Sequence, residues 1–323
     1  MLTPNRILVF RNGSIGNTLA AVPALRCLRE SFPNARIHVL VDRQGTELLQ
    51  NCPYVDSLVA YDRHGADRGL VGFLRTAAKV RALNPDACIL FKRFFRNGLL
   101  AKLSGASRRI GFATDGKAPF LNEAIPYDES VHVAELNLRL VRFVSANAKV
   151  PPLPEVFVTQ SEQVEVHAWL NENNVDAPYT IVHFGGVTTG ADFVPFELRV
   201  ALIKTLAVND SIVMIGNGTF EQQAASRINE VIPRAVNAIG LPLRQTIALI
   251  AGAARFIGTN SGPMHIAAAA RIPGIALFKR DDRYEIERVK WRPLFDDLKI
   301  VPVHTDSTQS EVVELARKAW PTD

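Results

Sequence analysis

The sequence predicts an α/β protein made of two doubly wound domains, each a mostly parallel sheet covered by helices on both faces. Short apolar runs alternate with helix-length amphipathic segments, which is the pattern of repeated βαβ units. The alternation stops at Val150-Pro151-Pro152-Leu153-Pro154 and then starts again. The chain has 323 residues, more than one hydrophobic core usually supports. These observations together favour two domains of similar size.

The strand-like runs of the first half are continuously apolar, as expected for strands buried on both faces. They cover residues 7–10, 36–41, 57–61, 87–91 and 109–112. Helix-length segments such as 18–31 and 70–83 separate them. We therefore expect a first Rossmann-like domain over residues 1–152, ended by a proline-rich linker that can continue neither a helix nor an inner strand.

The second half repeats the pattern and predicts a Rossmann-like domain over residues 153–305. Its expected strands are 180–184, 211–215, 236–239, 255–257 and 274–278, and its expected helices are 195–207, 220–231, 243–253 and 263–271. Residues 306–323 form a last helix, which opens with Thr308 and Glu311 at capping-box spacing. We expect this terminal helix to pack back on the first domain.

Composition excludes several classes of protein. Apolar residues make up 47% and charged residues 21%, an ordinary globular balance. The net charge of +5 suits an acidic or phosphorylated ligand, but no nucleic-acid motif accompanies it. The three cysteines have no metal-like spacing and predict buried free thiols. No apolar run approaches the ~20 residues of a membrane helix, and we expect a cytoplasmic protein without a signal peptide.

A glycine-bearing turn follows the first strand. It contains Arg11, Gly13, Ser14, Gly16 and Asn17, and a helix comes next. Bare backbone at such a turn lets a ligand approach the peptide N–H groups, and a helix start favours negative charge. Its G-x-x-G spacing is not the dinucleotide fingerprint, and a plain tight turn would leave the same pattern.

A second turn of this kind joins a short strand to the helix expected at 263–271. Asn260 and Ser261 can cap that helix or face a ligand, and Gly262 keeps the backbone bare. Pro263 suits the first helical turn, where its missing N–H does no harm. His265 follows on the side where a ligand would lie, although a packing role explains a single histidine equally well.

Two more glycine-rich strand ends share this edge of the second sheet. His183, Gly185 and Gly186 follow one strand, and Gly216 follows the next. Open α/β sheets bind ligands beyond the carboxyl ends of their strands, so a ligand cleft is expected there. Glu221, at the start of the next helix, can accept a hydrogen bond from a ribose or a base, or simply be a favourable acid in a first helical turn.

A basic aromatic stretch, residues 91–96, follows a strand of the first half. Its cations Lys92, Arg93 and Arg96 alternate with phenylalanines. They are candidates to contact a phosphorylated or acidic glycan at the inner membrane surface, or they are solvated cations beside buried rings.

In these segments the chain resembles glycosyltransferase family 9, the ADP-heptose:lipopolysaccharide heptosyltransferase group. The resemblance spans nearly the whole chain, from the strand and turn at 7–17 through 22–26 and 99–112 to the helix start at 261–265. It implies a GT-B fold, with two Rossmann-like domains facing an interdomain cleft, and inverting transfer from a nucleotide-sugar donor held by the second domain. It also implies a glycan or glycolipid acceptor at the first domain, no metal, and a cytoplasmic location with peripheral contact to the inner membrane.

Two positions depart from the family pattern, because Asn17 and Asn260 stand where members usually carry aspartate. An amide can orient a hydroxyl but cannot take its proton. Asn17 is then expected to orient the acceptor, and His183 and Asp115 are the remaining candidates for the base, unless the leaving group alone drives the reaction. Residues 191–195 also lack the basic residue that members often carry before a Trp-Pro pair.

Other readings stay open. The two aspartate-to-asparagine differences also fit a family member that binds nucleotide or glycan without turnover. A Rossmann oxidoreductase would use Asp42, at the end of the second strand, to meet a ribose. Other GT-B enzymes, such as sugar epimerases, share the expected fold.

Overall fold

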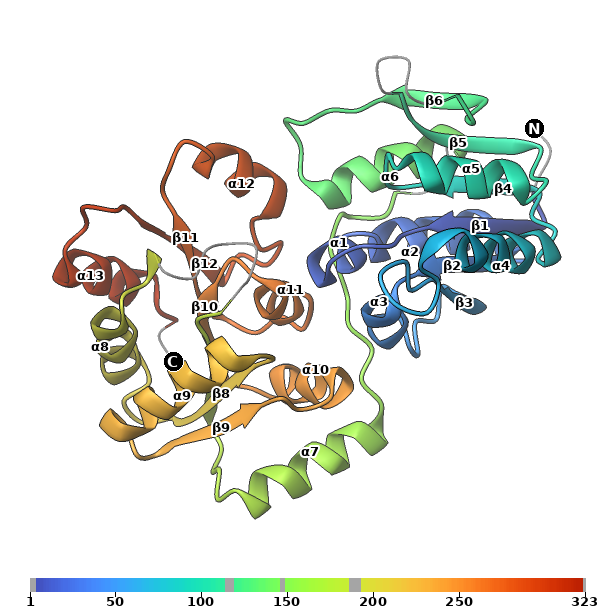
Figure 1. The fold of residues 1–323 in the computed structure, drawn as a ribbon. Helices are drawn as coiled ribbons and strands as arrows, with labels where there is room; N and C mark the ends of the chain where they lie inside the picture. The colour runs from blue at the N-terminus through green and yellow to red at the C-terminus, as the bar shows by residue number, and fades with distance from the viewer. Residues whose placement is uncertain (1–3, 114–118, 146–148, 186–192, 322–323) are drawn as a thin grey trace. The chain divides into compact units, whose positions relative to one another are not determined.

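The protein is described by a computed structural model covering residues 4–113, 119–145, 149–185 and 193–321. The chain forms two compact units, residues 1–157 and 158–323. Each unit contains a six-stranded, all-parallel sheet with helices on both faces (Figure 1). The predicted α/β class, with two doubly wound domains, is confirmed.

The first unit is built on the strand order β3-β2-β1-β4-β5-β6. Its strands are β1 (Arg6–Phe10), β2 (Arg36–Val41), β3 (Ser57–Ala60), β4 (Ala87–Leu90), β5 (Arg108–Ala113) and β6 (Glu123–Pro126). Its helices are α1 (Ile15–Leu19), α2 (Val22–Ser31), α3 (Arg43–Leu48), α4 (Gly69–Ala82), α5 (Phe95–Leu103) and α6 (Val133–Val144). Helices α2 and α6 pack side by side, as do α4 and α5, and each pair encloses its own hydrophobic cluster.

The second unit repeats this topology with the order β12-β11-β10-β7-β8-β9. Its strands are β7 (Tyr179–His183), β8 (Ser211–Gly216), β9 (Ala235–Ile239), β10 (Arg255–Thr259), β11 (Gly274–Lys279) and β12 (Leu298–Val303). Its helices are α7 (Gln160–Glu172), α8 (Phe196–Leu206), α9 (Thr219–Val231), α10 (Leu243–Ala251), α11 (Gly262–Ala269), α12 (Tyr284–Trp291) and α13 (Gln309–Ala319).

The segment predicted as one helix over residues 18–31 is two helices. Helix α1 ends at Leu19, and α2 begins at Val22 with Pro23 in its first turn. Proline lacks the N–H that a continuing helix would need, so it fits the start of a new helix. Strands β6 and β12 were not predicted. Strand β6 lies at the edge of its sheet, and its residues alternate between half-buried and exposed, so it leaves little hydrophobic signal in the sequence.

The terminal helix α13 packs on the second unit, and the prediction that it packs back on the first domain is wrong. Val312 and Ala316 are buried in the cluster formed by α8 and the second sheet, and Trp320 adjoins it. The predicted capping box is present, because Thr308 and Glu311 bond reciprocally at the start of the helix. The apolar face of α13 packs against α8 and β12.

The first unit extends to Phe157, so residues 153–157, which follow the expected boundary at residue 152, stay with the first unit. Phe157 stacks edge-on against Tyr54 at 5.8 Å, and the Tyr54 hydroxyl donates to Glu155 at 3.1 Å. Upstream, Arg142 of α6 donates to the carbonyl oxygen of Val150 at 2.9 Å.

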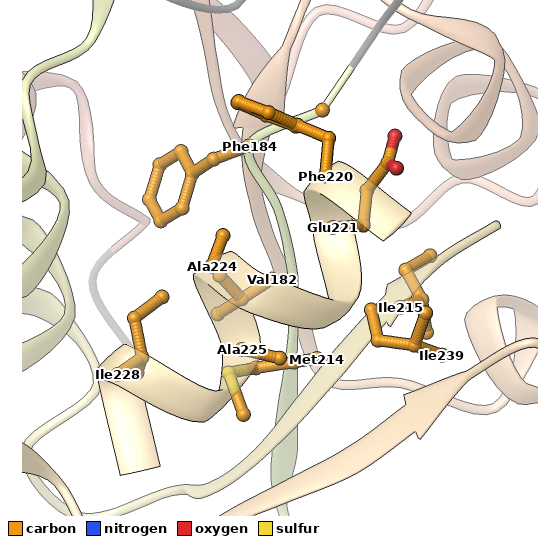
Figure 2. Close-up of a pocket in the computed structure, with 11 residues that line it drawn as sticks. Val182, Phe184, Met214, Ile215, Phe220, Glu221, Ala224, Ala225, Ile228 and Ile239 are labelled. Atoms are coloured by element: carbon orange, nitrogen blue, oxygen red, sulfur yellow. The ribbon is translucent and has the colours of Figure 1, made fainter. Parts of the chain in front are cut away.

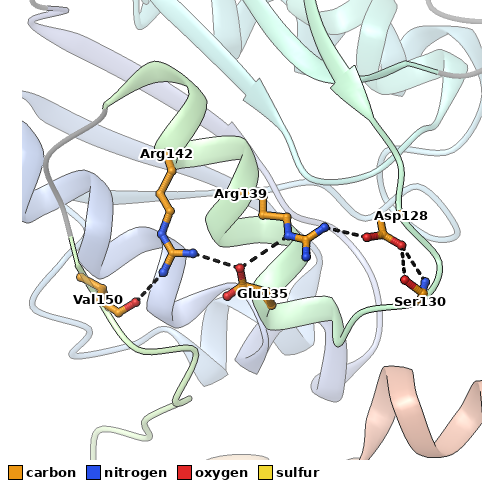
Figure 3. Close-up of polar contacts among 6 residues, drawn as sticks. All are labelled: Asp128, Ser130, Glu135, Arg139, Arg142 and Val150. Carbon is orange, nitrogen blue, oxygen red and sulfur yellow. Dashed lines mark hydrogen bonds and ion pairs between the residues drawn. The ribbon is translucent and has the colours of Figure 1, made fainter.

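Figure 3 shows that this arginine belongs to a chain of polar contacts along α6. Glu135 accepts from Arg142 at 3.0 Å and pairs with Arg139 at 3.5 Å. Arg139 in turn contacts Asp128, which also accepts from the backbone and hydroxyl of Ser130. These contacts hold the loop before α6 and the segment after it to one helix.

All three cysteines, Cys27, Cys52 and Cys88, are buried and free, as predicted. Among the described residues, no helix is long and apolar enough to cross a membrane.

Candidate functional site

The predicted site residues lie where strand order reverses in each sheet. In the first sheet β1 lies between β2 and β4, and in the second β7 lies between β8 and β10. Helices leave such a pair of strands toward opposite faces of the sheet, which opens a crevice at the carboxyl ends. The turn after β1, the stretch after β4, and the turns after β7 and β10 therefore occupy the positions where open α/β sheets bind ligands.

In the first unit, Arg11 is the fixed centre of the turn after β1. Its side chain is fully buried, its Nε donates to the Asn17 carbonyl oxygen at 2.7 Å, and its terminal nitrogen donates to the Asn17 amide oxygen. The Asn17 amide nitrogen then donates to Ser14 Oγ at 2.8 Å. Burial lowers the pKa of Arg11 to about 9, against the opposing effect of Asp42, so the guanidinium remains charged at neutral pH. The turn thus holds a buried cation whose hydrogen-bond partner is an amide.

Asp42, at the end of β2, ties two backbone segments together. One carboxylate oxygen accepts from the Gly13 N–H at 2.6 Å, and the other accepts from the Gly45 N–H at 2.8 Å as the N-cap of α3. Both oxygens are therefore engaged by peptide nitrogens. This arrangement explains Asp42 as a structural tie of the turn, without the ribose contact that the oxidoreductase reading would assign to it.

Lys92 lies against the same turn. A Cβ placed on Gly13 would come within 2.7 Å of Lys92 Nζ and 3.6 Å of Asn17 Cβ, and Gly13 has φ +151°, so glycine is required here. Lys92 Nζ and the Arg63 guanidinium both lie over the Phe94 ring, at 4.9 and 5.1 Å. Burial, with the nearby charges of Arg11 and Arg63, lowers the pKa of Lys92 to about 8.

The other two cations of the basic stretch have different neighbours. Arg93 stacks on Tyr127 at 3.6 Å and approaches Glu129 at 3.9 Å. Arg96 lies over Phe73 at 5.5 Å and reaches the Gly69 carbonyl oxygen at 3.5 Å. Of the three predicted acceptor cations, Lys92 is therefore the one in contact with the turn after β1. Gly16 is buried in α1.

In the second unit, His183 and Ser261 join the ends of β7 and β10. The Ser261 hydroxyl lies 3.1 Å from His183 Nδ1 and 3.1 Å from the carbonyl oxygen of Thr259. Thr259 Oγ1 donates to the Gly185 carbonyl oxygen at 2.9 Å. Burial lowers the pKa of His183 to about 4, so its imidazole is neutral at pH 7 and a weak proton acceptor. The Ser261 hydroxyl does not cap α11, which corrects the capping alternative for this residue.

The side chain of Glu221 packs against three glycines, where any larger residue would collide with it. A Cβ on Gly185, Gly216 or Gly218 would meet the Glu221 side chain at 2.4, 2.6 or 3.0 Å. The residue lies in the first turn of α9 and lines a pocket bounded by apolar side chains (Figure 2). That lining comprises Val182, Phe184, Met214, Ile215, Phe220, Ala224, Ala225, Ile228 and Ile239, together with Gly185. A carboxylate at the rim of an apolar pocket can accept from hydroxyl groups of a ring that enters it.

The remaining predicted residues surround the start of α11. The Asn260 N–H donates to the carbonyl oxygen of Leu277 at 3.1 Å. Gly262 and Pro263 form the first turn of α11. The His265 ring meets Trp291 of α12 edge-on, at 5.9 Å between ring centres. Two predicted residues, Asp115 and Gly186, lie outside the described residues.

Four residues near these turns were not predicted from the sequence, namely Arg63, Asn97, Trp291 and Arg199. Arg63 shares Phe94 with Lys92, and Asn97 exchanges hydrogen bonds with Asn12 in a buried amide pair. Trp291 contacts His265. Arg199, in α8, places its guanidinium 5.9 Å from the Phe184 ring and 5.6 Å from the Phe220 ring. Its Nε donates to the carbonyl oxygen of Val194 at 2.8 Å, so it supplies a cation beside residues 193–195, which have none. A basic residue in a first helical turn is a weak signal by itself, and only the fold brings it to the end of β7.

No group of three or more histidine, cysteine or acidic side chains among the described residues is arranged to hold a metal ion.

Comparisons with known proteins agree with this geometry. The family described as "Glycosyltransferase family 9 (heptosyltransferase)" matches residues 73–318. A putative glycosyltransferase of Haemophilus influenzae is 24% identical, covering 98% of both chains. A family 9 glycosyltransferase structure from Veillonella parvula superposes with a TM-score of 0.82 at 16% identity, covering 98% of this chain and 97% of that one.

A second solved structure, Escherichia coli ADP-heptose lps heptosyltransferase II, superposes with a TM-score of 0.78 at 20% identity and covers 97% of this chain and 98% of that one. These structures share the two Rossmann-like sheets found here and establish the GT-B fold class. The family match covers most of the chain, including the basic stretch after β4 and all the turns of the second sheet. The chain therefore belongs to glycosyltransferase family 9, and it is a glycosyltransferase.

Proposed function

We propose that this enzyme transfers a heptose or a related sugar from a nucleotide-sugar donor, ADP-heptose or another nucleoside diphosphate sugar, to a lipopolysaccharide or another cell-surface glycan. The main support for the proposal is the position of the Glu221 carboxylate. It lies against Gly185 and Gly216, two glycines at the ends of neighbouring strands of the second sheet. A carboxylate in this position can accept from the ribose hydroxyls while the nucleoside lies against the apolar pocket. The name of the Escherichia coli relative supports both the donor and the acceptor class.

The diphosphate of the donor is assigned to the start of α11, at Ser261 and Gly262. The backbone N–H groups of a helix start stabilise negative charge, and that charge grows on the diphosphate as its bond to the sugar breaks. His265 is held beside this turn by Trp291. Arg199 is a further cation of the same unit that can oppose the diphosphate.

The acceptor is assigned to the first unit. Its hydroxyl oxygen attacks the anomeric carbon, and the carbon–oxygen bond to the diphosphate breaks on the opposite face, which inverts the configuration. Asn17, held by Arg11 and Ser14, orients the hydroxyl. Lys92, beside the same turn, is assigned to an acidic or phosphorylated group of the acceptor.

The base is not Asn17, because an amide cannot take a proton at neutral pH. His183 is a poor candidate, since its pKa lies at about 4 and its Nδ1 faces Ser261. Asp115, which lies outside the described residues, remains a candidate to take the acceptor's proton. We propose that stabilisation of the leaving diphosphate supplies most of the acceleration, and that without such a base the proton passes to water as the new glycosidic bond forms. We propose that the reaction needs no metal ion, and that the enzyme works in the cytoplasm with peripheral contact to the inner membrane.

A thermal-shift screen with ADP-, GDP-, UDP- and dTDP-sugars tests the donor. A bound donor raises the melting temperature by linkage, so the screen names the nucleotide directly. We expect Glu221→Gln to weaken the nucleotide about tenfold, equal to the loss of roughly 1.4 kcal/mol of charge-assisted hydrogen bonding. Glu230→Gln, an exposed position on the same helix, is the matched control. An equal loss of nucleotide affinity in Glu221→Gln and Glu230→Gln would contradict the assignment of Glu221 to the nucleotide.

A second candidate function is binding without turnover, which the amides at Asn17 and Asn260 favour. Release of nucleoside diphosphate in the presence of glycan acceptors separates the two. Stabilisation by one nucleotide sugar without any release supports a binding protein. Release that depends on acceptor supports the transferase.

A further inference from the structure

A cleft of the second unit lies between the start of α8 and helix α9. Its volume is about 290 Å³, close to the roughly 300 Å³ at which small-molecule pockets begin. Phe196 and Arg199 line it from α8, and Phe220, Ala224 and Arg227 line it from α9. Phe220 and Ala224 also line the pocket that contains the Glu221 side chain, so the two cavities are neighbours (Figure 2). None of the described lining residues of the cleft belongs to α11, where the donor diphosphate is assigned.

The ionisable side chains that line this cleft are both cations, Arg199 and Arg227. No carboxylate is among its described lining residues, whose other members are apolar or neutral. Arg227 is exposed at the surface, so a ligand can reach it from solvent. Two guanidinium groups in a cleft lined by no acid give the cleft a positive potential, which attracts a small anion.

Aromatic rings hold both guanidinium groups at the cleft. The guanidinium of Arg227 lies 4.2 Å from the centre of the Phe196 ring. That of Arg199 lies 5.6 Å from the centre of the Phe220 ring, and its Nε donates to the carbonyl oxygen of Val194 at 2.8 Å. Arg199 is only 7% exposed, so the surrounding fold fixes its position. A guanidinium placed over a ring keeps its charge and can donate its N–H groups to an anion.

We infer that this cleft binds a small aromatic phosphate ester, with its phosphate on Arg227 beside Arg199 and its ring against Phe196 and Phe220. The oxygens of a phosphate match the fork of N–H donors on a guanidinium, and two such groups suit its double negative charge. Phenylalanine side chains at the same place pack favourably with a flat ring. The inference goes beyond the proposed function, because the nucleoside is assigned to the pocket with Glu221 and the diphosphate to the start of α11.

Isothermal titration calorimetry of the full chain with phenyl phosphate tests the site. We expect phenyl phosphate to bind at least about tenfold more tightly than inorganic phosphate, because the ester adds contact with the two rings. Arg227→Gln should weaken phenyl phosphate binding about tenfold through the loss of a charge-assisted hydrogen bond. Arg227→Lys, which keeps the charge without the fork of donors, should lose less. Arg317→Gln, which replaces an exposed arginine of α13 outside the cleft, is the matched control and should bind like the original protein.

A variant of the neighbouring pocket separates this cleft from the donor site. Glu221→Gln should leave the affinity for phenyl phosphate unchanged, whereas a loss there would place the ligand in the nucleotide pocket and overturn the inference. So would an unchanged affinity in Arg227→Gln. Equal affinity for inorganic phosphate would show a general anion site, and equal affinity for benzoate would show no preference for phosphate, and either result would also overturn it. A protein that binds phenyl phosphate as expected but transfers no sugar would keep this inference and reject the proposed function instead.

Discussion

Asn17 and Arg11 show how one atom changes the chemistry of the turn after β1. The amide oxygen of Asn17 accepts from a guanidinium that is fully buried, at a position where an aspartate would supply a compensating charge. A buried cation with a neutral partner is costly unless other groups bear the charge, and Asp42 is the acid that acts on it. The local charge of this turn is accordingly more positive than it would be with a carboxylate at position 17.

Asn17→Asp should preserve sugar transfer or raise it, by up to about 100-fold if proton removal limits the rate. The new carboxylate would pair with Arg11 and could take the acceptor proton. The measurement is acceptor-dependent release of nucleoside diphosphate. Asn12→Asp is the control, because it places a carboxylate in the same turn but within the amide pair with Asn97, where it should lower stability without a gain in rate. Complete loss of transfer in Asn17→Asp would contradict the assignment of the turn.

His183 makes stability depend on pH. Burial lowers the pKa of His183 from 6.5 to about 4, so between these values the unfolded chain binds more protons than the folded one. The free energy of unfolding therefore falls as the pH drops through this window, by about 2 kcal/mol between pH 7 and pH 5. Urea denaturation of His183→Gln at both pH values should show this slope removed, whereas the exposed His167→Gln should retain it. An unchanged slope in His183→Gln would show that other groups cause the acid sensitivity.

At the scale of single elements, helix α7 is attached to helix α10 by an ion pair. Glu162 pairs through both oxygens with Arg244, at 2.7 and 2.6 Å, and also completes the capping box with Thr159. Both side chains are mostly buried, at 15 and 13% exposed. The helix has few buried apolar residues, Val166 and Leu170, so this contact contributes much of its attachment.

Glu162→Gln should lower the free energy of unfolding at pH 7 by about 2 kcal/mol. The hydrogen bond from Arg244 holds the pKa of Glu162 at about 2, below its ordinary 4.5. The contribution is therefore fully present above pH 4.5 and is lost as the pH falls toward 2. Chemical denaturation of the variant and of Glu165→Gln, exposed on the same helix, measures the difference. If Glu162→Gln and Glu165→Gln lower the free energy of unfolding by the same amount, the ion pair with Arg244 does not stabilise the fold.

At the scale of the whole molecule, the chain contains the same topology twice, with a candidate ligand-binding edge in each copy. The two copies differ in chemistry. The first edge carries the buried Arg11 and the cations around Phe94, whereas the second carries a neutral histidine, glycines and the Glu221 carboxylate. This difference supports separate ligands, an acidic acceptor for the first unit and a nucleotide for the second.

Hydrogen exchange with and without nucleoside diphosphate tests this division in the intact protein. We expect slower exchange at the turns after β7, β8 and β10 and in the first turns of α9 and α11, because the bound nucleotide shields these amides. Exchange in the turn after β1 should be unchanged. Protection confined to the first unit would reverse the assignment of donor and acceptor.

The pattern of apolar residues in the sequence was enough to predict most of the secondary structure of this protein. Continuous apolar runs identified ten of the strands to within one or two residues, because strands buried on both faces leave a local signal. Glycines at strand ends indicated the candidate site edges, because bare turns leave a local signal too. Contacts between distant segments left no such signal. Only the tertiary structure decided that α13 packs on α8, that Asp42 bonds Gly13, that Arg63 and Lys92 share Phe94, and that Glu221 fills the space of three glycines. These contacts depend on which strands lie side by side, and that order is set by packing over the whole sheet, which no window of the sequence contains.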